Sequence, residues 1–173
     1  MKILVVIILA ALGVGCDSMS RQVDTLRLKA LHADESNSAQ RQHAIEQVQE
    51  VNPETGEVSF SGETIYVIMS DFQFTPDLIR LKSGAVTRIR LSNTAWVTHY
   101  FGAAEFFQRG AEIVNILEST VPAGQHHIPV APFSERDVYV LVKAPGEYPL
   151  SCHVPNHLKA GMQGMLVVEP APL

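Results

Sequence analysis

Short β-rich runs separated by turn residues dominate the chain from about residue 56 to its C-terminus. The run 86–92 alternates apolar and polar side chains, which is typical of a strand with one buried face. Comparable runs, each followed within a few residues by Gly, Pro, Asn or Ser, cover 64–69, 78–82, 137–143, 148–153 and 165–169. This pattern predicts an all-β sandwich over residues 56–173.

Residues 103–119 interrupt the strand pattern. Their apolar side chains recur at roughly helical spacing, at Phe106, Phe107, Ile113, Val114, Ile116 and Leu117. We therefore expect a short helical insertion over about 103–119, with a break near Gly110.

The N-terminal residues 1–16 have the composition of an export signal. One lysine precedes an apolar run that is shorter than the roughly 20 residues of a membrane span. The run ends in Gly-Val-Gly-Cys, which resembles the end of a bacterial lipoprotein signal and marks Cys16 as the lipidated residue. An ordinary secreted protein and an uncleaved anchor are the alternatives. Each of them predicts a protein that works outside the cytoplasm, in the cell envelope or periplasm.

Residues 17–55 are polar and contain no aromatic side chain, so they can bury little apolar surface. We expect a flexible polar tether here, between a membrane anchor and the folded domain. The whole chain has 13 Lys and Arg against 18 Asp and Glu, a net charge of −5, and shows no basic tract. This balance argues against a nucleic-acid partner.

The chain has 2 cysteines, Cys16 and Cys152. If Cys16 carries lipid or is removed with the signal, Cys152 remains as a single thiol in an oxidising compartment. A buried, inert cysteine is one interpretation and a metal ligand is the other. The neighbours of Cys152 favour the second.

Residues 148–164 bring Cys152, His157 and Met162 together on one short segment between two predicted strands. A thiolate, an imidazole and a thioether are soft ligands that suit copper, and the chain lacks the closely spaced cysteine pairs of structural zinc sites. A trigonal copper site needs a second imidazole. The best candidate is His99, which follows the strand 86–92 and precedes aromatic residues.

From about Tyr66 to Glu169 the chain resembles the cupredoxins, the type 1 or blue copper proteins. The resemblance rests on residues 72–76, Ile79, Gly84, Asn93, His99, Phe101, 145–148, Cys152, His157, Gly161, Met162 and Gly164. It implies a Greek-key β-sandwich with one type 1 copper per chain. It also implies that two imidazoles and the thiolate bind copper in a plane, with Met162 as a weak axial ligand.

Three further histidines leave open whether the chain binds a second metal ion. The sequence Cys152-His153 also looks like the last domain of multicopper oxidases, but the paired His-x-His motifs and the second domain of those enzymes are missing from this sequence. We expect His153 to point to the opposite face of its strand. We interpret His126 and His127 as a loop or strand-edge pair, with an auxiliary copper contact as the alternative.

The resemblance implies a single-electron carrier rather than an enzyme, with redox partners meeting the surface around His157. A copper-binding or copper-resistance protein of the envelope uses the same four ligands and is the main alternative. A copper nitrite reductase or oxidase component would need a second copper, for which only His126, His127 and His153 remain.

Overall fold

The computed structural model describes residues 16–117 and 121–171. The expected signal peptide therefore lies, apart from the backbone of Cys16, outside the described residues. Contacts divide the chain into two compact units, with the division between Gln40 and Arg41.

Helix α1 runs from Cys16 to Glu46. The sequence predicts a flexible polar tether over 17–55, and most of this segment is helical in the structure. No glycine or proline occurs within α1, and its many Gln, Ala, Glu, Arg and Leu residues have high helix propensity. The side chains of residues 22–40 are exposed. Among the described helices, none is both long enough and apolar enough to cross a membrane.

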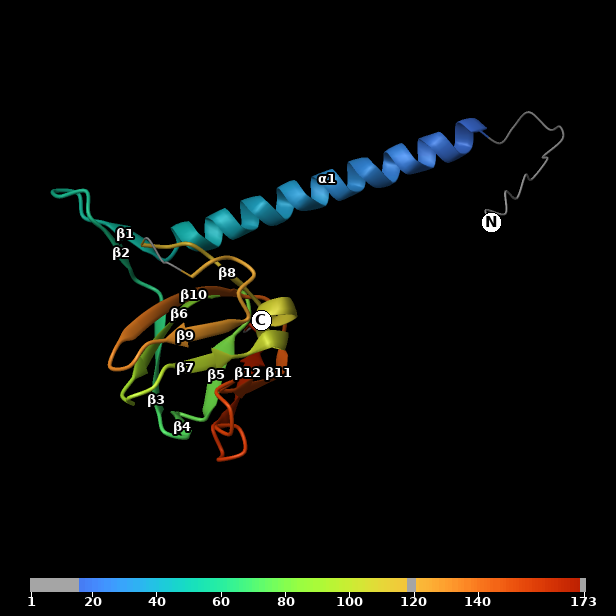
Figure 1. The fold of residues 1–173 in the computed structure, drawn as a ribbon. Coiled ribbons are helices and arrows are strands. Elements are labelled where there is room, and N and C mark those ends of the chain that lie inside the picture. Colours follow the sequence, from blue (N-terminus) through green and yellow to red (C-terminus); the bar gives the residue numbers. More distant parts are fainter. Residues whose placement is uncertain (1–15, 118–120, 172–173) are drawn as a thin grey trace, which may run out of the picture. The chain divides into compact units, whose positions relative to one another are not determined.

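Ten strands of the described residues form two five-stranded sheets that face each other (Figure 1). In order, the first sheet contains β4 (Gln73–Thr75), β3 (Glu63–Ser70), β6 (Val86–Asn93), β10 (Glu135–Val142) and β8 (Ala111–Ile113). The second contains β5 (Leu78–Lys82), β12 (Gln163–Glu169), β11 (Gly146–Ser151), β7 (His99–Gly102) and β9 (His127–Val130). The predicted all-β sandwich is confirmed.

Strand β6 shows why the alternating sequence gives a half-buried strand. It pairs in parallel with β3 and antiparallel with β10. Ile89 and Leu91 point into the core, where each buried side chain contributes about 1.5–3 kcal/mol. Arg90 lies less buried between them and forms two hydrogen bonds of 2.8 Å to the Asp137 carboxylate on β10. Packing inside and charge pairing across the sheet therefore fix the register of the central strands.

The expected helical insertion is only partly present. A short helical segment ends in the π-helix η1 (Phe106–Gly110), and strand β8 follows at once. Gly110 ends the helix as predicted, but Ile113 then pairs with Val140 at the edge of the first sheet. The sheet edge offers hydrogen-bond partners that a second helical turn would forgo, so β8 replaces the expected helix. Residues 118 and 119 lie outside the described residues.

The folded unit begins well before residue 56. The last turn of α1 and the hairpin of β1 (Gln49–Val51) and β2 (Val58–Phe60) pack against the outer face of the first sheet. This second apolar cluster contains Val86, Val114, Ile116, Tyr139 and Leu141, covered by Ala44, Ile45, Val48 and Phe60. The sequence analysis did not predict this cluster, because the residues that cover it are a few apolar side chains scattered in a polar segment.

We predict that this cluster contributes measurably to stability. Ile45→Ala removes apolar contacts with the sheet and should lower the free energy of unfolding by about 1–2 kcal/mol, less than for a fully buried isoleucine. Val51→Ala is the matched control, because Val51 is exposed and its truncation should change stability by no more than about 0.5 kcal/mol. Urea unfolding measures both. Equal, negligible losses would contradict the packing of 41–60 on the sheet.

Candidate metal centre

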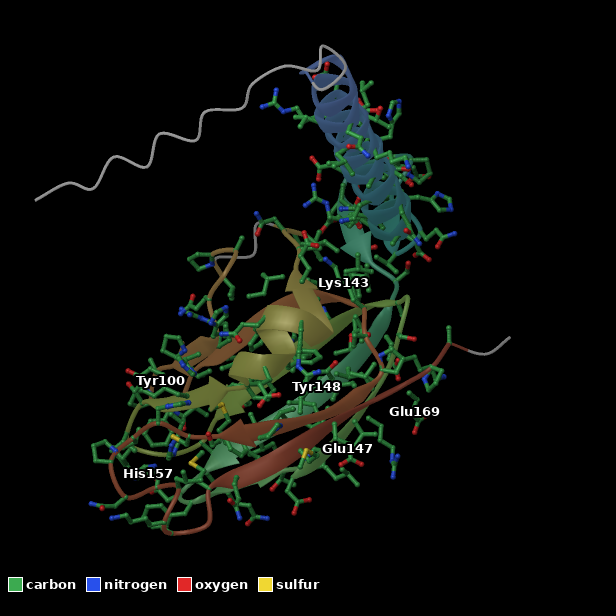
Figure 2. The ribbon with its side chains drawn as sticks, turned by 90° about the vertical axis from the view of Figure 1, so that its right-hand side faces the viewer. Tyr100, Lys143, Glu147, Tyr148, His157 and Glu169 are labelled. Carbon is green, nitrogen blue, oxygen red and sulfur yellow. The ribbon has the colours of Figure 1, made fainter. Side chains whose placement is uncertain are left out.

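The predicted ligands come from two separate parts of the chain that meet at one end of the sandwich. His99 is the first residue of β7, Cys152 directly follows β11, and His157 lies in the loop that leads to β12. The turn between β3 and β4 and the loop between β11 and β12 lie at this end (Figure 1). Figure 2 shows His157 here, with Lys143 towards the opposite end of the sandwich.

Three donor atoms converge on one point. Cys152 Sγ lies 3.7 Å from His99 Nδ1 and 3.9 Å from His157 Nδ1. One ligand atom from each of the three residues lies within 4.8 Å of the others. Donors placed trigonally around an ion, with metal–donor bonds of about 2.0–2.3 Å, are separated by about 3.5–4 Å. The residues therefore fit a single late transition-metal ion, and the thiolate with two imidazoles is the donor set of a type 1 copper site.

Burial favours the neutral, metal-binding form of His99. His99 is fully buried, and Cys152 is 2% exposed. Desolvation, and after it the neighbouring His157, lower the pKa of His99 below its ordinary value. The ring is thus kept in the neutral form that can donate a lone pair.

Asp71 lies behind His99, a residue that the sequence did not single out. Its Oδ1 is 3.1 Å from His99 Nε2, and its side chain is half exposed. The contact lacks the geometry of a hydrogen bond, and Nε2 has no other partner among the described residues. A carboxylate beside Nε2 nevertheless favours the tautomer with the proton on that atom, which leaves Nδ1 free to face Cys152. The residue was missed because it belongs to the β3–β4 turn, whose approach to His99 appears only in the fold.

Backbone hydrogen bonds close the loop that carries the other ligands. The amide of Cys152 donates to the carbonyl of Met162 at 3.1 Å, and the amide of Met162 donates to the carbonyl of His157 at 2.9 Å. His157 in turn donates its amide to the carbonyl of Val154 at 3.1 Å. Backbone hydrogen bonds therefore hold the loop at both ends and in its middle.

Met162 is fully buried and packs in the same apolar cluster as Cys152. The backbone of Met162 is hydrogen-bonded to that of Cys152, so the fourth predicted ligand lies in the same loop and the same apolar cluster. Its role as an axial ligand stays a prediction.

Asn93 fixes the segment that precedes His99. Its side-chain amide donates to the carbonyls of Val97 at 2.8 Å and Val130 at 2.9 Å, while its oxygen accepts from the amide of Ala95 at 2.9 Å. Asn93 is buried, so these bonds are made away from water, where they hold geometry well. These bonds fix the turn that places His99 at the start of β7.

Phe72 covers His157 and was also missed by the sequence reasoning. Its backbone adopts φ 75°, which is uncommon for a bulky residue. In this conformation its ring meets the His157 ring edge-on, with the centroids 4.9 Å apart. The sequence analysis includes Phe72 in the segment 72–76 that carries the resemblance, but it assigns this residue no role at the metal.

The remaining candidates lie outside the cluster. His153 is exposed and its ring lies beside that of His127, tilted by 57° with the centroids 3.9 Å apart. Burial, and then the neighbouring imidazoles, lower the pKa of His127. His126 lies near Gln108, with a nitrogen–nitrogen distance of 3.4 Å. Cys16 begins α1, and its side chain is outside what the structure describes.

Comparison with curated proteins finds a relative that is described as a cuproprotein. The chain is 25% identical over 117 residues to the copper-resistant cuproprotein CopI of Rubrivivax gelatinosus, a match that covers 66% of this chain and 71% of that protein. No protein-family model matches the chain.

Comparison with solved structures finds chains of partly similar arrangement. Auracyanin B has a TM-score of 0.45 and 22% identity, over 62% of this chain and 89% of its own. Auracyanin A, a "blue" copper protein from Chloroflexus aurantiacus, has a TM-score of 0.44 and 22% identity, over 61% of this chain and 98% of its own. A multicopper oxidase from Campylobacter jejuni has a TM-score of 0.48 and 17% identity, over 70% of this chain but 32% of its own.

The assignment rests on features of the chain itself, supported by the curated relative. The sandwich has the expected two sheets, and the buried thiol and imidazoles have the spacing of a trigonal site. The relative with detectable sequence similarity is described as a cuproprotein. The chain is an all-β sandwich whose buried thiol and two imidazoles fit a single type 1 copper site.

Proposed function

We propose that the chain is an extracytoplasmic electron carrier whose copper is held by His99, Cys152 and His157, with Met162 as the weak axial ligand. Copper bound by this donor set supplies reversible one-electron chemistry, because thiolate and imidazoles suit Cu(II) and the soft sulfurs suit Cu(I). The single observation that carries the proposal is a buried donor cluster whose geometry is fixed by the protein. A centre fixed in this way changes little when its charge changes, so electron transfer needs little reorganisation.

We expect the electron to reach the surface through His157. It is 9% exposed, whereas His99 is fully buried. An electron therefore has its shortest path to a partner through the edge of His157, beside Phe72. The ring of Phe72 limits the access of water to this edge without closing it.

The surface around this edge suits brief contacts with a redox partner. Four exposed apolar side chains, which we call the apolar rim, lie in the loops at this end of the sandwich: Phe72, Trp96, Phe133 and Leu158. Trp96 is 82% exposed and meets Phe133 edge-on, with ring centroids 4.7 Å apart. Small apolar surfaces of this kind are typical of transient electron-transfer complexes.

Copper handling is the second candidate, favoured by the similarity to a copper-resistant cuproprotein. A protein that holds or delivers copper has to release it, while an electron carrier has to keep it through many turnovers. The two functions therefore differ in the rate at which the ion leaves.

Electron exchange and copper release can be compared in the same sample. We expect electron self-exchange between the Cu(I) and Cu(II) forms, measured by NMR line broadening, to be at least a thousandfold faster than copper transfer to an added chelator. Leu158→Asp places a charge on the apolar rim and should slow self-exchange at least tenfold with chelator transfer unchanged. Copper release on the timescale of electron exchange would favour copper handling instead.

The ligand assignment has a direct spectroscopic test. Cys152→Ser should abolish the intense visible absorption of the Cu(II) form, because the band requires a copper–thiolate bond and Cys152 is the only free thiol among the described residues. His153→Ala is the matched control: it removes a neighbouring imidazole outside the cluster and should leave the band unchanged. An intense band that survives in Cys152→Ser would refute the assignment.

We further propose that Cys16 carries a lipid that anchors the chain to a membrane of the cell envelope, as the end of the N-terminal apolar run indicates. Stable anchoring needs more than one acyl chain, which a lipidated N-terminal cysteine provides. Cys16→Ser should move the protein from the membrane fraction to the soluble fraction, measured by immunoblot, with the copper spectrum intact. Membrane association that persists after normal processing would contradict the anchor.

A further inference from the structure

Two histidines from different strands meet on the outer face of the second sheet. His127 begins β9, and His153 lies two residues beyond the end of β11. Strand β7 lies between these two strands, and its last residue, Gly102, pairs with His127 on one side and with Ser151 on the other. The imidazole rings come within 3.9 Å of each other, centroid to centroid, at an angle of 57°.

Glycine at position 102 is what allows the two rings to meet. A Cβ atom there would collide with Nε2 and Cδ2 of His153 and with the carbonyl oxygen of Ser151. Any larger residue would force the His153 ring away from the sheet. The strand between the two histidines thus leaves room for their contact.

His127 also presents a nitrogen that lacks a partner. Its Nδ1 is buried and has no hydrogen-bond partner among the described residues. A buried polar atom without a partner is unfavourable, so a ligand that satisfies it is favoured. The neighbouring His153 ring is exposed and leaves an approach from solvent.

We propose that His127 and His153 form a second metal site, which binds a divalent late first-row ion such as Zn²⁺ or Cu²⁺ with water completing the coordination. Imidazole is a preferred ligand of these ions. In the His99–His157 pair the ring centroids are 5.1 Å apart. An outward rotation of the exposed His153 ring would bring the His127–His153 pair from 3.9 Å to a similar spacing.

This site is separate from the type 1 centre although His153 follows Cys152 directly. The Cys152 side chain is buried, whereas the His153 side chain is exposed. Successive residues of an extended segment point to opposite faces, so the two side chains lie on different sides of the sheet. A metal at His153 therefore takes no donor from the first centre.

Zinc titration of the copper-loaded protein tests the site. The first centre is filled with one equivalent of copper, and Zn²⁺ is then added in a calorimeter. We expect one further equivalent to bind, and His127→Ala and His153→Ala each to weaken this binding at least tenfold. His126→Ala is the matched control, because its ring lies near Gln108, and should bind Zn²⁺ as the unaltered protein does. The visible copper band should stay unchanged in all three variants.

Absence of a further zinc equivalent, or the same loss in His126→Ala, would overturn the proposal and leave the two rings as a simple stacked pair. If His127→Ala loses its copper band, its fold is disturbed and His153→Gln decides, because His153 is exposed. The difference in zinc stoichiometry between the unaltered protein and the His153 variants is measurable without copper as well. Failure of the type 1 assignment would thus be seen separately, as a missing visible band.

Discussion

The two hydrogen bonds that tie Met162 to Cys152 and to His157 hold the centre together, because they close the loop on which three of the four predicted ligands lie. The fourth, His99, reaches that loop because β7 lies beside β11 and pairs with it at Gly102 and Ser151. The loop and the strand pairing are made by backbone hydrogen bonds, so the positions of the donor atoms depend on the fold of the polypeptide.

A rigid centre has a functional consequence at the surface. His99 is enclosed by the sheet and by Asp71, whereas the His157 edge reaches the outside beside Phe72. The same end of the sandwich carries the apolar rim, so the proposed electron path and the proposed partner surface coincide. The proposed second metal site, with His127 and His153, lies on the outer face of the second sheet.

The sequence predicts the sandwich, and it points to the three residues of the buried cluster, because both leave local marks. Alternation in 86–92 follows from one-sided burial, and Cys152, His157 and Met162 share one segment. The sequence predicts poorly what depends on contacts between distant segments. Asp71 behind His99, Phe72 over His157 and the covering role of Ile45 have no periodic pattern. The helix expected after Gly110 became β8 because an open sheet edge outweighed helical spacing, a competition that is decided in the tertiary structure.

The central claim is that one thiolate and two imidazoles bind a single copper ion. X-ray absorption at the copper edge measures this donor set directly in the copper-loaded protein at one equivalent. The account predicts one short copper–sulfur distance from Cys152 and two nitrogen donors with the outer-shell scattering of imidazole rings. A first shell of nitrogen and oxygen alone, with no short copper–sulfur distance, would contradict it.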